Sequence, residues 1–297
     1  MYHRVSHAEL NDPYNIAVSP VNFREHLQVL NRHASPRPLR DVVDHRSTKS
    51  KHVAVTFDDG YSDNLYEALP LLEAEDISAT IFIATGMLDG DGFWIDKLAR
   101  CLLVDHGYPD NCMIQVGKNE IKLNLGTLEK RSATHRHLHS ILRTLHPDLI
   151  EKTISSLAAV LQIDPTPPNN ERPLSSQEVA KLASHPLIEL GGHTVRHPYL
   201  TCLSISEQKW EIETCQDTLK ALGAEESAAF AYPFGDHGSH SLITRLIVKR
   251  SGWHHAVVAG SRRNRYWLQR FAVPRHFVGN WDGEEFERRL IRWLRRG

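Results

Sequence analysis

The sequence lacks the features that mark a disulfide-rich secreted domain, a membrane protein or a nucleic-acid binder. It has 4 cysteines in 297 residues, and no two of them form a Cys-x-x-Cys pair, which excludes a disulfide scaffold. No apolar run approaches the roughly 18 residues that a membrane span needs. The 35 Lys and Arg residues balance 36 Asp and Glu residues. Because the net charge is only −1, we expect no nucleic-acid partner. Because no long apolar run is present, we expect no transmembrane segment.

The N-terminal segment also lacks a secretory signal. Met1 is followed by Tyr2, His3 and Arg4 and not by an apolar stretch, so the sequence as written predicts a cytoplasmic protein. The same residues resemble the end of a first strand whose beginning is missing. A longer N-terminus would change the prediction to an exported or membrane-associated protein.

Apolar strands alternate with amphipathic helices along most of the chain, which predicts an α/β fold. Ser175 and Glu178 have the spacing of a capping box at the start of one helix. The predicted strands are 52–57, 79–84, 187–190, 228–232 and 256–259, and the predicted helices are 65–75, 176–183, 204–222 and 239–251.

The alternation breaks between Asp89 and Asn170. Two short apolar segments flank residues 117–120, which predicts a hairpin, and residues 127–162 have a mostly helical pattern. We therefore predict a single domain over residues 1–297, with residues 89–170 as an insertion in one of its βα connections.

Three predicted strands end in residues suited to chemistry. Asp58 and Asp59 follow the first, His193 and His197 follow the second, and the turn 232–235 follows the third. In barrel enzymes the catalytic residues lie at the carboxyl ends of the strands. We therefore expect these residues to form one site.

The two histidines and two carboxylates are compatible with a metal site. His193 and His197 have a spacing that allows two imidazoles to bind one ion, although a chain with 19 histidines also contains incidental pairs. Asp58 and Asp59 make the metal-site interpretation stronger, because two adjacent carboxylates repel each other unless a cation neutralises them. The alternative is a solvated turn, since Asp-Gly is also a common turn sequence. One carboxylate and two histidines leave coordination positions open for water and substrate. The other carboxylate is then free to act as a base.

Three segments, in this order, resemble the NodB-type polysaccharide deacetylase family. They are Thr-Phe-Asp-Asp-Gly-Tyr at residues 56–61, His-Thr-Val-Arg-His at 193–197 and Ala-Tyr-Pro-Phe-Gly at 231–235. The resemblance covers nearly the whole chain, least clearly residues 89–170. It implies a distorted (β/α) barrel with fewer than eight regular units. It also implies metal-dependent removal of acetyl groups from a glycan that contains an N-acetylhexosamine.

The resemblance also implies roles for individual residues. Asp59, His193 and His197 would hold one divalent metal ion, and Asp58 would be the general base. Zinc is the expected ion, and cobalt, iron, nickel and manganese also suit nitrogen and oxygen ligands. The backbone N–H of Phe234 would stabilise the oxyanion of the tetrahedral intermediate.

Two positions depart from the family pattern. Phe234 stands where the family usually has a tyrosine, which matters little if the donor is the backbone N–H. Ala231 stands where the family usually has an arginine that contacts the catalytic aspartate. Either Arg275 or Arg196 could supply this cation from another loop, or Asp58 could work without one.

The general acid and the substrate contacts are less clearly marked. We predict His276 as the general acid from its place in the late strand-like stretch 271–278, although the family's acid histidine usually follows a leucine. Histidine suits the role because its pKa is near neutrality. His3 is the alternative, followed by His237. The predicted substrate contacts are Tyr61, Tyr232, Arg275 and Trp281.

Two other functions are compatible with the same residues. One is a related barrel hydrolase acting on a C–N bond outside carbohydrate. The other is a glycan-binding protein with a vestigial metal site. Asp58 argues against the second, because a protein that only binds glycan needs no base beside its metal ligands.

Overall fold

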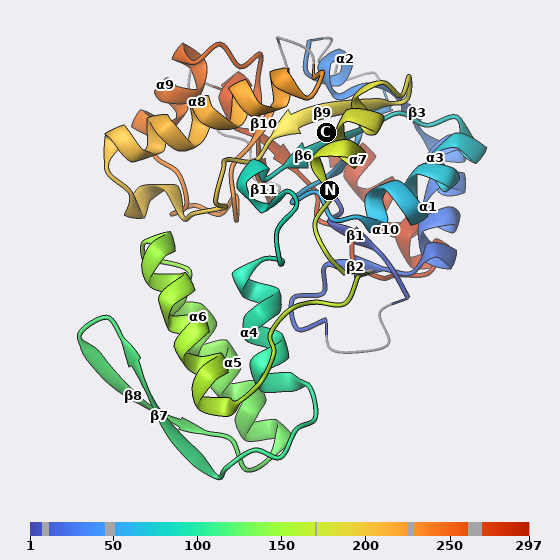
Figure 1. Ribbon diagram of the computed structural model, residues 1–297. Helices are drawn as coiled ribbons and strands as arrows, with labels where there is room; N and C mark the ends of the chain where they lie inside the picture. The colour runs from blue at the N-terminus through green and yellow to red at the C-terminus, as the bar shows by residue number, and fades with distance from the viewer. Residues whose placement is uncertain (8–11, 45–50, 170, 225–228, 261–268, 297) are drawn as a thin grey trace. The chain divides into compact units, whose positions relative to one another are not determined.

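The computed structural model describes residues 1–7, 12–44, 51–169, 171–224, 229–260 and 269–296 (Figure 1). The chain divides into two compact units. The first consists of Met1–Asp89 and Leu174–Gly297, and the second of Gly90–Pro173. Among the described helices, none is long and apolar enough to cross a membrane.

A parallel sheet forms the centre of the first unit. Its six described strands run in the order β12-β11-β10-β9-β6-β5, and every neighbouring pair is parallel. Because parallel strands end at the same edge, residues that follow different strands meet there. The strands are β5 (Val55–Phe57), β6 (Ala79–Ile83), β9 (Ile188–Gly192), β10 (Phe230–Ala231), β11 (Ala256–Ala259) and β12 (Val273–Arg275).

The sheet is curled, so its two end strands approach each other. Arg275 at the end of β12 pairs with Asp58, which directly follows β5 at the other end of the strand order. The chain's first residues bridge the same gap: Tyr2 forms a parallel bridge with Phe57, and the Val278 N–H donates to the Met1 carbonyl at 3.1 Å. The first unit is a distorted (β/α) barrel, which confirms the predicted fold class.

Helices cover the sheet. In Figure 1, α8 and α9 pack together in one group, and α1 packs against α3 and α10 in another. The helices are α1 (Pro20–His33), α2 (Leu39–Asp44), α3 (Leu69–Glu75), α7 (Ser176–Ala183), α8 (Ile205–Ala221), α9 (Leu242–Arg250) and α10 (Gly283–Arg296). Shorter elements are β1 (Arg4–Val5), β2 (Ala17–Val18), β3 (Ser35–Pro36), β4 (His52–Val53), η1 (Asn64–Ala68), η2 (Thr85–Met87), η3 (Leu200–Cys202) and η4 (Gln269–Phe271).

The core lies on both faces of the sheet, as expected for parallel strands covered by helices. Every residue of β5 and β6 is buried. Their side chains pack with apolar helix residues such as Leu27, Leu72 and Ile212. The unit therefore has a core of its own that does not depend on the polar residues at the strand ends.

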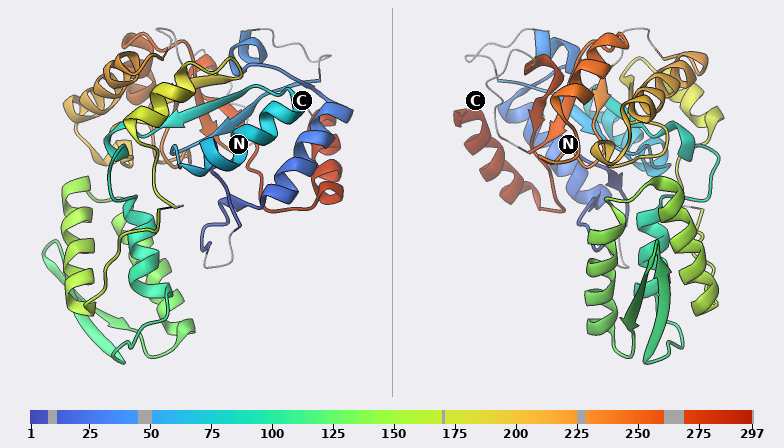
Figure 2. Two further views of the ribbon diagram at one scale, coloured as in Figure 1. Left: turned by 45° about the vertical axis from the view of Figure 1, so that its right-hand side comes forward. Right: turned by 90° about the vertical axis from the view of Figure 1, so that its left-hand side faces the viewer.

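The second unit is a hairpin with three helices, seen from two sides in Figure 2. β7 (Asn111–Val116) and β8 (Asn119–Asn124) are antiparallel, as predicted, with Gly117 at φ +62° in the turn. α4 (Trp94–Leu103), α5 (Leu128–Leu142) and α6 (Pro147–Leu161) complete it, with a buried cluster that includes Leu98, Leu138 and Leu157. Asn170, the last residue of the insertion predicted from the sequence, lies outside the described residues.

Several predicted boundaries shift for identifiable reasons. The Ser175–Glu178 capping box is present at α7, where the two reciprocal bonds are 2.7 and 3.2 Å long. α9 begins at Leu242, three residues later than predicted, because the Ser241 hydroxyl caps it. The predicted helix 65–75 consists of the π-helical turn η1 followed by α3. Ala228, the predicted start of β10, lies outside the described residues.

Candidate active site at the carboxyl edge of the barrel sheet

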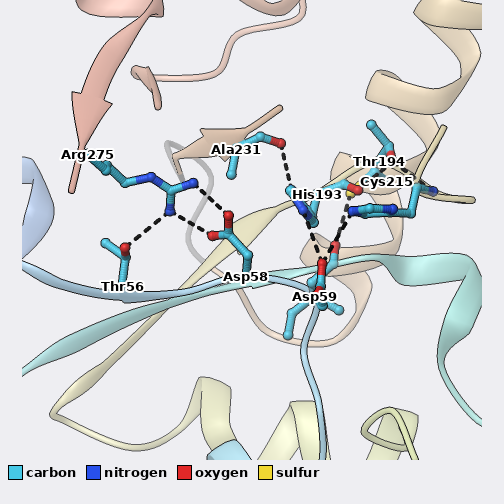
Figure 3. Close-up of polar contacts among 10 residues, drawn as sticks. Thr56, Asp58, Asp59, His193, Thr194, Cys215, Ala231 and Arg275 are labelled. Carbon is cyan, nitrogen blue, oxygen red and sulfur yellow. Dashed lines mark hydrogen bonds and ion pairs between the residues drawn. The ribbon is translucent and has the colours of Figure 1, made fainter. Parts of the chain in front are cut away.

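Asp59, His193 and His197 lie together where β5 and β9 end (Figure 3). Their ligand atoms are all within 4.8 Å of one another. The Asp59 Oδ1 is 3.4 Å from His193 Nε2 and 3.3 Å from His197 Nε2. All three side chains are buried. In the part of the chain that the structure describes, this is the one group of three or more histidine, cysteine or acidic side chains close enough to hold a metal ion.

The protonation pattern of this cluster suits a divalent ion. The Nδ1 of His193 is 2.8 Å from the Ala231 carbonyl oxygen, which can only accept a hydrogen bond. Nδ1 therefore carries a proton, and Nε2 is the ring nitrogen that faces Asp59. Metal sites whose histidine is oriented by a backbone carbonyl have the same arrangement. Burial raises the pKa of Asp59, but hydrogen bonds from His193 and His197 outweigh it and hold that pKa well below its usual value. One carboxylate oxygen and two imidazole nitrogens form a donor set typical of catalytic zinc.

The site is built from strained backbone. Asp59, Thr194, His197 and Phe234 have positive φ angles of 76°, 67°, 54° and 62°. They are four of the eight non-glycine residues with positive φ among the residues described. Such conformations cost about 1–3 kcal/mol each and concentrate at functional sites. Contacts with the surrounding residues must therefore hold the segments after β5, β9 and β10 in these conformations.

The two glycines before His193 allow close packing beneath it. A Cβ atom on Gly191 would lie 2.4 Å from the Phe82 ring, and one on Gly192 would lie 2.3 Å from the Trp253 ring. Two large aromatic side chains can thus pack against the end of β9. Substitution of either glycine would displace the segment that carries His193.

Asp58 faces away from the three-residue cluster and pairs with Arg275. The two guanidinium nitrogens Nη1 and Nη2 are each 2.6 Å from one carboxylate oxygen, and Nη1 also donates to the Thr56 hydroxyl at 3.1 Å (Figure 3). Burial raises the pKa of Asp58, but the charge of Arg275 outweighs this and leaves the pKa below its usual value. Of the possibilities left open by the sequence, Arg275 is therefore the cation that pairs with Asp58. Arg196, the other possibility, instead pairs with Glu211 at 2.8 Å.

We expect Arg275→Met to lower turnover and to move the acid limb of the pH–rate profile to higher pH by about one unit or more. Without the guanidinium, burial would raise the pKa of Asp58, so the base that the resemblance implies would become protonated at a higher pH. The measurement is kcat/KM across the pH range in which both proteins stay folded. Arg270→Met is the control, because Arg270 pairs with Asp44. An unmoved acid limb would mean that Arg275 does not set the charge of Asp58.

The structure does not bring His276 to the site. His276 follows Arg275, the last residue of β12, and its side chain takes a different direction. Arg275 points toward Asp58, whereas His276 is exposed and stacks on Trp293 of α10, with ring centroids 4.3 Å apart. This corrects the prediction of His276 as the general acid.

His3 lies close to both aspartates. Burial lowers the pKa of His3, against the opposing effect of the nearby Asp59 and Asp58 charges. Its Nδ1 is buried and has no hydrogen-bond partner among the described residues. The side chain of His237 is exposed. Of the three histidines considered from the sequence, His3 is thus the one that the structure places near Asp58.

The predicted substrate contacts lie elsewhere than expected. Tyr61 is fully buried beneath the guanidinium of Arg4, and the Tyr232 hydroxyl donates to the Phe271 carbonyl in the core at 3.0 Å. Trp281 packs beside α10, with the Arg289 guanidinium 4.0 Å from its ring centroid. Tyr61, Tyr232 and Arg275 are therefore buried among structural partners, whereas Trp281 is partly exposed.

Two other aromatic side chains flank the ligand histidines. The Phe234 ring centroid is 4.9 Å from that of His197, and the Tyr199 ring is 5.7 Å from Phe234. The Tyr199 hydroxyl donates to Asp236 at 2.9 Å. Both rings are partly exposed. Phe234 and Tyr199 are therefore partly exposed aromatic side chains next to these histidines, of the kind that can stack on a sugar ring.

Two buried acidic residues next to the site were not foreseen. Asp63 accepts hydrogen bonds from the Arg4 Nε at 2.9 Å and the Val5 N–H at 3.2 Å, and so anchors the strand segment that follows His3. Burial raises the pKa of Asp63 to about 6 despite the charge of Arg4. Glu211, on α8, binds the loop between His193 and His197. No motif marks either residue, because each is recognisable only from the backbone groups that it binds.

Comparison with known proteins agrees with this geometry. The family model described as polysaccharide deacetylase matches residues 45–254, a range that includes Asp58, Asp59, His193 and His197. The chain belongs to the polysaccharide deacetylase family. A search of curated protein sequences gave no significant match to this deacetylase.

Solved structures share the deacetylase's fold over nearly its whole length. The Streptococcus pyogenes deacetylase PplD in complex with acetate is 18% identical, with 97% of this chain and 95% of that chain covered and a TM-score of 0.54. IcaB from Ammonifex degensii is 16% identical, with 99% and 94% covered and a TM-score of 0.60. A de-N-acetylase from Aggregatibacter actinomycetemcomitans is 14% identical, with 97% of each chain covered and a TM-score of 0.58.

The family assignment confirms the predicted enzyme class. This deacetylase is a hydrolase that removes N-acetyl groups from a glycan, as its family membership indicates. A glycan that carries N-acetyl groups is therefore its substrate class.

Proposed function

We propose that this deacetylase is a metal-dependent enzyme that cleaves the acetamide of an N-acetylhexosamine residue within a glycan. One observation carries the proposal: the Asp59–His193–His197 cluster lies next to a second carboxylate, Asp58, whose charge is held by its own arginine. A pure binding site needs no such additional ionised group. We expect zinc first among the divalent ions that this donor set suits.

The residues have separate tasks in this reaction. A divalent ion held by Asp59, His193 and His197 would acidify a water molecule and polarise the acetyl carbonyl. Asp58 accepts the proton of the attacking water, a role that requires a carboxylate ionised at neutral pH. Its lowered pKa meets that requirement. The backbone N–H of Phe234 donates to the oxygen on which negative charge develops.

We assign the general acid to His3. An amine is a poor leaving group until its nitrogen is protonated, so the reaction needs a proton donor near Asp58. His3 is half-buried near both aspartates, and its buried Nδ1 has no hydrogen-bond partner among the described residues. Asp63 and Asn64 hold the backbone that follows the His3 side chain, because Asn64 Nδ2 donates to the His3 carbonyl at 2.9 Å and Asp63 accepts from the Val5 N–H at 3.2 Å.

His3→Ala should lower kcat on an N-acetylated sugar oligomer by about 10²-fold or more. It should leave hydrolysis of 4-nitrophenyl acetate much less affected, because a nitrophenolate departs without protonation. The alkaline limb of the pH–rate profile should also disappear, since only the protonated imidazole donates. Both substrates are measured with the same metal-loaded preparation.

His276→Ala is the matched control for His3→Ala. It removes an exposed histidine that stacks on Trp293, and we expect nearly unchanged rates on both substrates. Equal loss on the amide and the aryl ester in His3→Ala would contradict the role of His3 as an acid. A loss on the amide alone in His276→Ala would return that role to His276.

Acetate release tests the proposed function itself. N-acetylated hexosamine oligomers are incubated with the protein, before and after treatment with a chelator and after return of Zn²⁺. We expect release that the chelator abolishes and Zn²⁺ restores. Release that is indifferent to the chelator would rule out the metal centre. Metal-dependent hydrolysis of simple acetamides, with none of sugar oligomers, would favour a C–N hydrolase outside carbohydrate.

A further inference from the structure

Glu211 of α8 is fully buried and points its carboxylate at the loop between the two ligand histidines. Its Oε2 accepts the backbone N–H groups of both Val195 and Arg196 at 2.9 Å, and its Oε1 accepts the Arg196 Nε at 2.8 Å. All three bonds are directed at the residues that separate His193 from His197. Both carboxylate oxygens are therefore used to hold this one loop.

The loop needs such an anchor because of its shape. Thr194 and His197 both have positive φ angles, and a left-handed conformation is especially unfavourable for a β-branched residue such as Thr194. The conformation brings two consecutive N–H groups together, which creates a small anion-binding concavity. The carboxylate of Glu211 fills it. A charged acceptor makes stronger hydrogen bonds here than a neutral one.

Glu211 is itself held by rigid structure. α8 packs against β9 and η2, and Cys215, one turn later on α8, lies with its Sγ 3.7 Å from the Ile83 carbonyl oxygen. From the other side, the Thr85 N–H and the Gly86 N–H donate to the carbonyls of Thr194 and Val195 at 3.0 and 2.8 Å. The loop is thus clamped between a helix and the end of β6.

We propose that Glu211 is a positioning residue that preorganises His193 and His197 for metal binding. This inference rests on the proposed metal-dependent function. The carboxylate does not touch the ligand imidazoles, and it acts through the backbone that sets their separation and direction. Loss of its charge should leave the histidines present but less often in the conformation that brings both Nε2 atoms to Asp59.

The test is the metal affinity of Glu211→Gln. Glutamine keeps the size of the side chain but turns an N–H₂ group toward the Arg196 guanidinium, which is also a donor. We expect the dissociation constant for Zn²⁺, measured by competition with a chromophoric chelator, to rise about 10- to 100-fold. The Co²⁺-loaded variant should also show a shifted visible absorption spectrum, because the coordination geometry changes. A purely structural role would lower the melting temperature without altering that spectrum.

Glu213→Gln is the matched control. Glu213 is on the same helix and pairs with Lys209 at 3.8 Å and the Ser251 hydroxyl at 3.2 Å. We expect its Zn²⁺ affinity and Co²⁺ spectrum to equal those of the wild type.

A double variant covers the case in which Glu211→Gln is recovered unfolded. Arg196→Gln Glu211→Gln removes both charges of the pair together and so leaves neither of them unpaired. It should show the same weakened Zn²⁺ affinity.

The outcomes separate this inference from the proposed function. A wild-type protein that binds no Zn²⁺ would overturn the metal centre and, with it, the role of Glu211. A wild type that binds one ion, with equal affinity and spectrum in Glu211→Gln or the double variant, would overturn only the role of Glu211.

Discussion

Asp58→Asn should reduce deacetylation by about 10²-fold or more while the protein keeps its metal ion. Asparagine has nearly the shape of aspartate but cannot accept a proton from water. The side chain lies beside, and not within, the Asp59–His193–His197 cluster, so the metal ligands remain. The measurement pairs kcat on an N-acetylated sugar oligomer with metal analysis of the same preparation. The loss should extend to 4-nitrophenyl acetate, because attack by water is needed for either leaving group.

The control for Asp58→Asn is Asp44→Asn, which neutralises an aspartate paired with Arg270 and should retain wild-type turnover. Loss of the metal from Asp58→Asn would make Asp58 a ligand and require the roles of the two aspartates to be reassigned. Turnover near that of the wild type would remove Asp58 from the mechanism.

Asp59→Ala and His193→Ala should each abolish both metal retention and activity. Each variant leaves two of three ligands, and the deleted side chain cannot be replaced from within the buried cluster. Most of the fold should survive, because the apolar core of β5, β6 and the covering helices does not include these side chains. Metal content after dialysis, circular dichroism and acetate release on the same samples provide the measurement.

His185→Ala is the matched histidine control for these ligand variants. His185 pairs with Glu73 at 3.0 Å near the surface, and its removal should change neither metal content nor rate. Undiminished metal occupancy in Asp59→Ala or His193→Ala would place the ion elsewhere.

Local sequence patterns predicted the parts of the fold that depend on local interactions. The alternation of apolar strands and amphipathic helices identified β6, β9, β11, α7 and α8 to within a few residues, and the capping box fixed the first residue of α7. The closure of the barrel was not predictable in this way. It depends on contacts of the segments around Tyr2 and Val278 with each other and with β5, which are far apart in sequence.

The candidate site shows the same division. Asp59, His193 and His197 were recognisable because two short motifs carry them, and the structure brings them together. For Asp58 the sequence left three possibilities open, a pair with Arg275, a pair with Arg196 or no cation, because the choice depends on how far the sheet curls. His276 was chosen for its position along the chain, which does not reveal that its side chain stacks on Trp293 of α10 while Arg275 reaches Asp58. Glu211 has no motif at all.

The ion pair between Asp58 and Arg275 joins residues 217 positions apart. During synthesis, the segment with both aspartates leaves the ribosome long before β12 exists, and domains generally acquire structure from the N-terminal side. Until β12 docks, a carboxylate destined for burial has no cation and must stay hydrated, so this edge of the barrel cannot close. Docking of β12 therefore both closes this edge of the barrel and gives Asp58, the proposed base, its cation. We expect a nascent or shortened chain that ends before β12 to have no hydrolase activity.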